Sequence, residues 1–555
     1  MLGGKDSKYE DSRTRSRFSE GLSGGRERKN SGDRSRGKSS EGVFMYTPGE
    51  YQQALEDMPG VIDEIIKMGA HLLEPTVEER KQVYAAIRTF IAARDRIVYG
   101  GTALDESVGA IEPADRFYND YNRSDIEFYS PEPIQDLIDL TNTLHRAGFQ
   151  RVVGKEAQHM GSYNVIVDFE LYCDITYMPK LVYHRVQTNK IGNIRYAHPH
   201  FLLIDGLRIF TQPLTAADFR WEKTLKRMYL LTKHYPLPFR TPRDPRQKVD
   251  NDAVSCIGFL LTDYLGAANP HNMMITGMHA YNWYLGHVIG HKKIQKVASA
   301  SVDKLIKQRI PVYMAEFCAE HYAEAVKDVW DALKIKVPDA KKLSIKEYHP
   351  FFQFTLRSAI ISYQGVPVCR IYSTEGLCVP IQSSGDAFPY VSYQYLLMYL
   401  LIQRFRAYID GDKDLEQMYG GAASILLYAK NIWCSTLRLR PHNDTVFAEY
   451  VGTCLGKTMN FRRESFLRSH ERYKAGKHPF RYEPQKFFNK TEEERERFNP
   501  TRFNFPNISG NVINNPNAMI WINSGEDLIR SGLEEEDLSD LDGSSYESDF
   551  SEEWD

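Results

Sequence analysis

The sequence predicts an α/β (α+β) protein made of two lobes between two polar tails. Short apolar strands alternate with amphipathic helices over residues 97–235. A helical stretch, several strands and a long apolar helix follow over residues 250–460. Both ends of the 555-residue chain contain few large apolar residues. A chain of this length can bury two or three sizeable cores.

The two tails differ in charge. Residues 1–45 are basic and rich in Ser and Gly, whereas residues 526–555 carry 13 Asp/Glu and one Arg. The acidic tail therefore holds a charge of −12, and the rest of the chain about +9. We expect both tails to be disordered because they cannot bury enough apolar surface. A basic body favours a polyanionic partner, with which the acidic tail would compete, although solvated tails around an ordinary enzyme fit equally well.

Cysteine use and hydropathy indicate the compartment. The seven cysteines show no metal-ligand spacing, which predicts reduced thiols in a cytosol-like compartment. The N-terminus lacks the apolar segment of a signal peptide, and apolar runs such as 395–402 fall short of the ~20 residues that a membrane span needs. We therefore expect a soluble intracellular protein without membrane contact.

The first domain is expected over residues 46–245. A helix should begin after Thr76, which has the capping-box spacing to Glu79. A short strand over 97–99 should end at Gly100-Gly101. Residues 125–130 are predicted to form the next strand, and residues 163–177 one long strand, because polar and apolar residues alternate there with Ile166 as the one exception.

Three carboxylates lie on these strands. Asp125 and Glu127 are two residues apart, so they share one face of their strand, and Asp174 lies on the polar face of a strand that can pair alongside. Carboxylates that converge in this way repel one another unless a cation lies between them, and their oxygens suit Mg²⁺ or Mn²⁺. The alternative interpretation is that Asp125 and Glu127 lie on an ordinary strand edge and that Asp174 is a solvated polar residue. The pattern Asp-x-Glu is common in protein sequences and does not by itself indicate a metal site.

The turn Gly100-Gly101-Thr102 strengthens the metal-site interpretation. Glycines let a backbone approach a phosphate, and the start of the following helix supplies free N–H groups. Thr102 could add a hydroxyl donor. A glycine turn between a strand and a helix is common by itself. A glycine turn followed along the chain by Asp125, Glu127 and Asp174 on later strands is a much more specific signal of a metal site.

Basic residues mark two further segments. A helix over 215–235 presents Lys223, which could clamp a triphosphate, although a solvated helix face would have the same pattern. Its neighbours Lys226 and Arg227 are weaker candidates. The second domain, 250–500, ends in a stretch over 457–502 where 13 Lys/Arg alternate with aromatic residues. That stretch could follow an RNA backbone, or its rings could pin the chain onto the second domain.

The order of these motifs resembles the DNA polymerase β-like nucleotidyltransferase superfamily. The passages YGGTAL, SDIEFYSPEPIQDLIDLTNTLHRAGF, GKEAQH, VDFELYCDITYMPK and LRIFTQPLTAADFRWEKTLKRMYLL are similar to the poly(A) polymerase catalytic subunits of poxviruses and giant DNA viruses, and to the giant-virus branch most of all. The resemblance covers residues 90–240 well and 350–460 loosely. Glu127 stands where many members have Asp, and the gap from Gly101 to Asp125 is long.

The resemblance implies a nucleotidyltransferase palm with a mixed sheet, and a second, degenerate nucleotidyltransferase-like lobe. It makes Asp125, Glu127 and Asp174 the catalytic and metal-binding residues, and Gly100, Gly101 and Thr102 the phosphate turn. ATP as donor, an RNA 3′ end as acceptor, a homodimer, and a place in the virion or host cytoplasm are also implied. A different RNA or tRNA nucleotidyltransferase, or a non-catalytic RNA-binding protein with a degenerate fold, remain alternatives.

Overall fold

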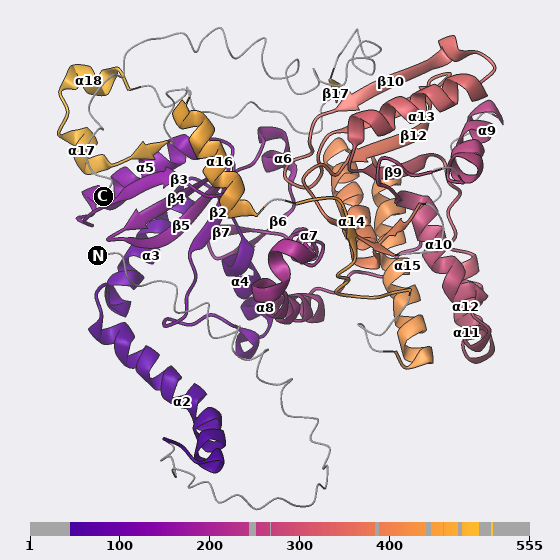
Figure 1. The fold of residues 1–555 in the computed structure, drawn as a ribbon. Coiled ribbons are helices and arrows are strands. Elements are labelled where there is room, and N and C mark those ends of the chain that lie inside the picture. Colours follow the sequence, from indigo (N-terminus) through magenta and orange to yellow (C-terminus); the bar gives the residue numbers. More distant parts are fainter. Residues whose placement is uncertain are drawn as a thin grey trace, which may run out of the picture.

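The computed structural model describes residues 45–242, 251–266, 268–382, 388–439, 446–458, 460–474, 480–498 and 512–513. They form two lobes, each built on one mixed β-sheet with helices packed against it (Figure 1). The two predicted disordered tails lie outside the described residues, apart from Met45. Among the described helices, none combines the length and the apolar character that a bilayer crossing requires.

The first lobe contains an eight-stranded sheet in the order β16-β3-β4-β5-β2-β1-β7-β6. The strand β2 pairs in parallel with β5, as does β1 with β7, and the other pairs are antiparallel. The strands are β1 (Ile97–Tyr99), β2 (Ile126–Ser130), β3 (Val153–Glu156), β4 (Ser162–Val167), β5 (Glu170–Tyr177), β6 (Thr188–Ile191), β7 (Ile194–Ala197) and β16 (Arg481–Tyr482). The central position of β2, between β1 and β5, brings the predicted turn and carboxylates together.

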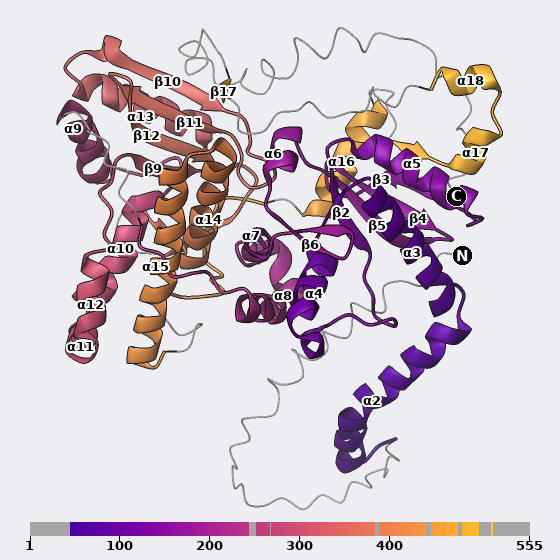
Figure 2. The same cartoon turned by 180° about the vertical axis from the view of Figure 1, so that it is seen from behind.

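The helices of the first lobe begin and end largely where the sequence predicts. In α3 the side chain of Thr76 accepts a hydrogen bond from Glu79 N, and the Glu79 carboxylate accepts one from Thr76 N, which confirms the capping box. The elements are α2 (Pro48–Leu72), α3 (Val77–Ala93), α4 (Gly100–Ile111), η1 (Pro113–Asp115), α5 (Pro133–Arg146), α6 (Lys180–Arg185), α7 (Pro199–Phe210) and α8 (Pro213–His234). In both views α2 extends away from the body of the lobe (Figures 1 and 2).

The predicted single strand over 163–177 is wrong, because these residues form a hairpin. Its strands β4 and β5 are antiparallel, and Val167 lies opposite Glu170. The two turn residues, Asp168 and Phe169, have φ angles of 48° and 67°. Positive φ at both central residues gives the turn whose twist matches that of the strands. The turn was missed because Asp168 and Phe169 continue the alternation of polar and apolar residues.

The second lobe contains a nine-stranded sheet in the order β15-β13-β14-β8-β9-β12-β11-β10-β17. Its strands are β8 (Met273–Ile275), β9 (Ala315–Ala319), β10 (Leu343–Tyr348), β11 (Ser358–Tyr363), β12 (Val366–Ser373), β13 (Val379–Gln382), β14 (Tyr390–Val391), β15 (Cys454–Leu455) and β17 (Val512–Ile513). Its helices are α9 (Asn251–Phe259), η2 (Leu260–Tyr264), α10 (Gly277–Gly290), α11 (Lys292–Val297), α12 (Ser299–Ile306), α13 (Tyr322–Lys336), η3 (Ala340–Lys342), α14 (Tyr393–Asp410) and α15 (Lys413–Leu437). The predicted long helix after the strands corresponds to α14.

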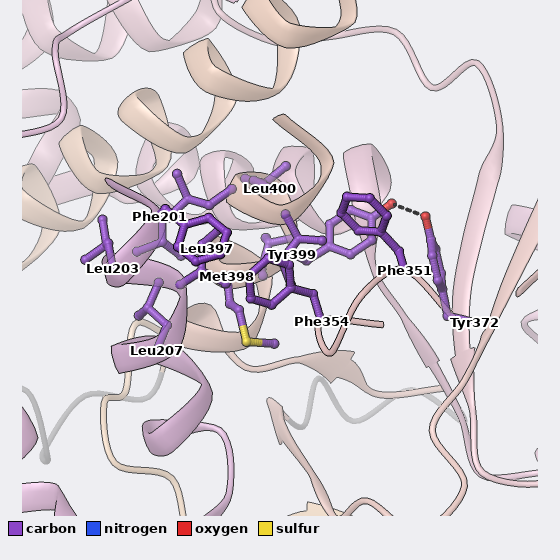
Figure 3. Close-up of a cluster of buried hydrophobic side chains, with 14 of the residues drawn as sticks. Phe201, Leu203, Leu207, Phe351, Phe354, Tyr372, Leu397, Met398, Tyr399 and Leu400 are labelled. Carbon is purple, nitrogen blue, oxygen red and sulfur yellow. Dashed lines mark hydrogen bonds between the residues drawn. The ribbon is translucent and has the colours of Figure 1, made fainter. Parts of the chain in front are cut away.

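An aromatic and aliphatic cluster joins the lobes. The ring of Phe201, in α7, lies 5.2 Å from that of Phe354 and 5.1 Å from that of Phe405, which both belong to the second lobe. Leu203 and Leu207 of α7 and Leu397 and Met398 of α14 are drawn in the same cluster (Figure 3). Burial of such side chains is the main stabilising term in a protein core, and it fixes the two lobes against each other here.

The segment after the second lobe returns to the first. Tyr482 of β16 lies opposite Gly154 of β3, and its hydroxyl donates a hydrogen bond of 2.8 Å to Asn142 Oδ1. The helices α16 (Phe461–Lys474), α17 (Pro484–Phe488) and α18 (Glu492–Glu496) lie beside the first sheet in both views (Figures 1 and 2). Residues 480–498, expected with the domain 250–500, therefore pack on the first lobe.

The sequence predicts that all seven cysteines are reduced, and this prediction is wrong for two of them. Cys378 and Cys454 form a disulfide that links the start of β13 to β15. The other five cysteines are free thiols, and four of them are buried. Sequence spacing gave no sign of this pair, because 76 residues separate the two cysteines and the sheet brings them together.

Candidate active site

The predicted carboxylates lie on neighbouring strands at the centre of the first sheet. Asp125 immediately precedes β2 and Glu127 is the second residue of that strand. In the parallel pairing of β2 with β5, Glu127 lies directly opposite Asp174. Since side chains alternate along a strand, Asp125 and Glu127 project to the same side of the sheet. The structure thus brings together the three residues that the sequence selected.

The Gly-Gly turn fits closely against Glu127. Gly100 has a φ of +67°, which an L side chain rarely adopts. A Cβ atom added to Gly100 would lie 1.6 Å from Glu127 Oε2, so this carboxylate occupies the space that a side chain would need. The amide of the next residue, Gly101, donates a hydrogen bond of 3.0 Å to Glu127 Oε2. Glycine at position 100 is therefore required by both conformation and contact.

Thr102 holds the turn to β2. Its hydroxyl donates to the carbonyl oxygen of Asp125 at 3.3 Å, and the residue is 7% exposed. In the structure this hydroxyl and the Gly101 amide are thus both engaged by β2. They link the helix α4 to the strand that carries Asp125 and Glu127. The helix start and the acidic residues form one connected unit.

Burial and mutual repulsion perturb the carboxylates. Burial, followed by the charges of Asp125 and Asp174, raises the pKa of Glu127 to about 8. Burial and the Asp125 charge also raise the pKa of Asp174, although Asn164 donates a hydrogen bond to its Oδ1. Ser124 donates to Asp125 Oδ1 at 2.5 Å. Without a cation, the folded site therefore favours a proton on part of this acidic set.

The oxygen atoms of these neighbouring side chains suit a divalent cation, but the three side chains do not converge on one point in the structure. Among the described residues, no three His, Cys, Asp or Glu side chains are close enough to hold an ion together. Hydrogen bonds hold Glu127 to Gly101 and Asp174 to Asn164. Oxygen ligands and uncompensated negative charge are nevertheless the features that attract Mg²⁺ or Mn²⁺. Asp125, Glu127 and Asp174 are the residues that would hold such an ion.

Basic side chains of α8 flank the acidic residues. Although Lys223 keeps much of its surface in water, partial desolvation and the Arg227 charge lower its pKa, while the charges of Asp125 and Glu127 oppose this effect. Arg227 lies beside the turn, since a Cβ atom on Gly101 would lie 3.2 Å from its Nη2. The Arg227 guanidinium also donates to the Tyr118 hydroxyl. Positive charge therefore borders the turn on the side of α8.

Two residues lie close to the site although the sequence singles out neither as a leading candidate: Arg227 and Asn164. Arg227 lies one helical turn after Lys223, so the spacing of four residues already placed both on one face. Asn164 lies opposite Asp174 in the β4–β5 pairing. Treating 163–177 as one strand hid this relationship, because the pairing depends on the turn at Asp168-Phe169. Recognition of that turn would have identified Asn164.

Two families together match most of the chain, and so does a viral relative. The family described as "Poly(A) polymerase catalytic subunit" matches residues 85–216, and that described as "APMV, Putative poly(A) polymerase, catalytic subunit, C-terminal" matches residues 267–522. A "Putative poly(A) polymerase catalytic subunit" of Acanthamoeba polyphaga mimivirus is 39% identical over 515 residues, which cover 89% of this chain and 88% of that protein. An African swine fever virus protein (isolate Pig/Kenya/KEN-50/1950) described in the same words is 29% identical over 171 residues, or 30% of this chain and 35% of its own length.

A solved structure has the same fold. The crystal structure of the Megavirus polyadenylate synthase matches with a TM-score of 0.80 and 36% sequence identity, covering 87% of this chain and 95% of that chain. The fold is thus that of a nucleotidyltransferase with a second lobe. The chain belongs to the family of viral poly(A) polymerase catalytic subunits, and it is an enzyme of that class. Enzymes of this class generally depend on a divalent metal ion.

Proposed function

We propose that the first lobe transfers AMP from ATP to the 3′-hydroxyl of RNA at the site of Asp125, Glu127 and Asp174, and so polyadenylates mRNA. The observation that supports this proposal most is the pairing of β2 with β5, in which Glu127 lies opposite Asp174. This pairing aligns two carboxylate side chains beside the turn Gly100-Gly101-Thr102. The three carboxylates would hold Mg²⁺ or Mn²⁺. When bound, such ions stabilise the attacking and leaving oxygens of a phosphoryl transfer.

The remaining residues would position the triphosphate. The N-terminus of the 12-residue helix α4 provides backbone N–H groups and positive potential, and the turn Gly100-Gly101-Thr102 lets a phosphate approach them. The Gly101 amide, which donates to Glu127 in the structure, would be available to a phosphate if that carboxylate held a cation instead. Lys223 and Arg227 would neutralise charge on the leaving pyrophosphate, so most of the catalysis would come from positioning and electrostatics.

The helix α16 is the proposed contact for the RNA backbone. Phe466 and Tyr473 are 67% and 71% exposed, and Arg462, Arg463 and Lys474 on the same helix are exposed as well. Exposed rings next to basic side chains suit stacking on bases and contact with phosphates. By contrast, Phe480 and Tyr482 are buried against the first lobe. These rings hold that part of the predicted basic-aromatic stretch onto the first lobe, and not onto the second domain as the sequence-based alternative had it.

We further propose that the protein is a homodimer held together through α2. Although the helix also contains Pro59 and exposed apolar residues outside this series, five of its exposed apolar residues follow spacings of four, three, four and three: Tyr51, Leu55, Met58, Ile62 and Ile65. This spacing is that of a coiled-coil seam, which needs a second helix to cover it. A second copy of the chain would supply an identical helix. Because the relatives are viral, we propose that the enzyme works in the virion or in the host cytoplasm.

The test offers ATP, CTP, GTP and UTP singly to the purified full chain with an end-labelled RNA primer, in Mg²⁺, in Mn²⁺ or in EDTA. We expect long products with ATP and a divalent ion, and none in EDTA. Efficient extension with UTP, or completion of a CCA end, would support another RNA or tRNA nucleotidyltransferase. Metal-dependent binding of ATP without any extension would contradict the proposal and support a non-catalytic RNA-binding protein.

A further inference from the structure

The second lobe repeats the turn of the candidate active site. In the first lobe Tyr99, with φ −132° and ψ −168°, precedes Gly100 and the helix α4. In the second lobe Thr276, with φ −132° and ψ −165°, precedes Gly277 and the helix α10. Gly277 has a φ of +65°, and an added Cβ atom would lie 1.8 Å from Glu316 Oε2. Glu316 therefore occupies the same place against its glycine as Glu127 does.

The pairing of strands identifies what replaces the other two carboxylates. Glu127 lies opposite Asp174 in a parallel pair, and Glu316 of β9 lies opposite Arg370 of β12 in the corresponding parallel pair. Arg370 thus takes the position of Asp174. Two residues before the glutamate, Met314 takes the position of Asp125. The second lobe has exchanged two potential metal ligands for a thioether and a fixed positive charge.

A cavity of about 320 Å³ lies at this position in the second lobe. Its volume falls at the lower end of the range for small-molecule sites, roughly 300–1,000 Å³. The residues that correspond to the active-site acids, namely Met314, Glu316 and Arg370, all line it. The aromatic rings of Tyr348 and Tyr419 contribute to the lining as well. The repeated turn therefore borders a space large enough for a small ligand.

Two buried donors in the cavity wall have unsatisfied hydrogen-bonding atoms. Arg370 is 8% exposed, and its Nη2 donates to Ser358 Oγ at 3.2 Å, but its Nε has no partner among the residues that the structure describes. Gln403 is 4% exposed, and within the same described part of the chain its Nε2 also lacks a partner. Buried N–H donors are normally paired, so both call for an acceptor that enters the cavity.

The carboxylates of the wall leave Arg370 without an ion pair among the described residues, although its guanidinium lies over the rings of Tyr348 and Tyr372. Arg406 is 3.9 Å from Asp410, and Asp412 accepts a hydrogen bond from Leu415 N at the start of α15. Glu316 accepts hydrogen bonds from Met278 N and from the Tyr399 hydroxyl, and burial raises its pKa, which favours its neutral form. Among the described residues, no carboxylate forms an ion pair with Arg370. An anionic acceptor would satisfy its charge.

We propose that this cavity binds a mononucleotide without a metal ion, with Arg370 and Gln403 holding its phosphate. In the first lobe the carboxylates would need a cation before a phosphate could bind beside them, whereas in the second lobe the guanidinium of Arg370 would supply the positive charge itself. The rings of Tyr348 and Tyr419 offer surfaces for a base. The site is distinct from the proposed catalytic site and keeps a counterpart to only one of the three acidic residues there, Glu316, so its role is binding.

The test titrates ATP into the purified full chain by calorimetry in EDTA, where the catalytic carboxylates have no cation. We expect one ATP to bind per chain, and to bind equally in Asp125→Asn. In Arg370→Gln and Gln403→Leu the affinity should fall by at least about tenfold, because hydrogen bonds to phosphate are lost. Arg357→Gln, whose guanidinium pairs with Glu375 outside the cavity, should bind as the wild type does.

Three outcomes would overturn the proposal. They are no ATP binding in EDTA, unchanged binding in the two cavity variants, and loss of binding in Asp125→Asn. If thermal melting shows that Arg370→Gln fails to fold, Gln403→Leu and the cavity-filling Met418→Trp decide the matter, and unchanged binding in both would refute it. AMP should compete with ATP. If tripolyphosphate competes as well as ATP does and AMP does not, the site takes an inorganic polyanion and the mononucleotide assignment is wrong.

Discussion

Glu127 lies directly opposite Asp174 on parallel strands, and its Oε2 accepts a hydrogen bond of 3.0 Å from Gly101 N. Glu127 therefore lies between the glycine turn at the start of α4 and Asp174 on β5. Because β1, β2 and β5 are consecutive in the sheet, these groups are placed by the core of the lobe and not by mobile loops. This arrangement makes the following predictions specific.

Binding of a divalent ion should release protons. Burial and the charges of Asp125 and Asp174 raise the pKa of Glu127 to about 8, so its carboxyl is largely protonated at pH 7 in the metal-free protein. A cation needs the carboxylate form, so we expect release of about one proton per chain when Mg²⁺ or Mn²⁺ binds at pH 7. Calorimetry in two buffers of different ionisation enthalpy measures this number. Identical heats in the two buffers would contradict the prediction.

Glu127→Gln should stabilise the metal-free protein at alkaline pH. The folded-state pKa of Glu127 lies above the ordinary value of 4.5, so the folded state holds a proton that the unfolded state loses. Its contribution to stability is fully present below pH 4.5 and is lost as the pH rises through about 8. The melting temperature in EDTA should therefore fall less between pH 5 and pH 9 in Glu127→Gln than in the wild type. If the melting temperatures of Glu127→Gln and the wild type fall equally between pH 5 and pH 9, Glu127 is not a group whose pKa is raised on folding.

Gly100→Ala should abolish RNA extension while the second lobe stays folded. Its methyl group would lie 1.6 Å from Glu127 Oε2, and φ is +67°, so the carboxylate must move. Gly148→Ala is the matched control, because φ there is +95° but no atom lies within 4 Å of the added Cβ. The control should lose only about 1–2 kcal/mol of stability and keep its extension rate. Equal loss of extension in both variants would mean that backbone strain alone explains the effect.

Charge on the apolar face of α2 should dissociate the proposed homodimer. Ile62→Asp and Ile65→Asp place a carboxylate in the exposed series, where a coiled coil buries its apolar residues. Light scattering on a sizing column should then give the mass of one chain instead of two. Gln53→Asp adds the same charge outside the series and should leave the dimer intact. A wild-type protein that runs as a monomer at micromolar concentration would refute the assignment of α2.

Local sequence signals predicted the parts of the fold that depend on neighbours along the chain. The capping box at Thr76 and Glu79 gave the start of α3, and the spacing of Asp125 and Glu127 gave the shared face on β2. The turn at Asp168-Phe169 was missed, because its residues continue the alternation of the flanking strands. A period of two cannot reveal a tight turn unless glycine or asparagine marks it.

Relationships that depend on distant pairing could not be predicted. Cys378 and Cys454 meet only because β15 joins the sheet beside β13. Glu316 and Arg370 are 54 residues apart and form no recognisable motif, and their equivalence to Glu127 and Asp174 emerges only from strand register. The return of residues 480–498 to the first lobe rests on the two-residue strand β16, which is too short to leave a pattern in the sequence.

The central claim is that Asp125, Glu127 and Asp174 carry nucleotide transfer, and primer extension by isosteric variants tests it most directly. Asp125→Asn and Asp174→Asn should extend an RNA primer with ATP and Mg²⁺ or Mn²⁺ at least about 100-fold more slowly than the wild type. Asp168→Asn, in the turn of the hairpin that carries Asp174, should extend it at the wild-type rate, since asparagine also accepts a positive φ. Wild-type extension by Asp125→Asn or Asp174→Asn, in protein that melts normally, would contradict the account.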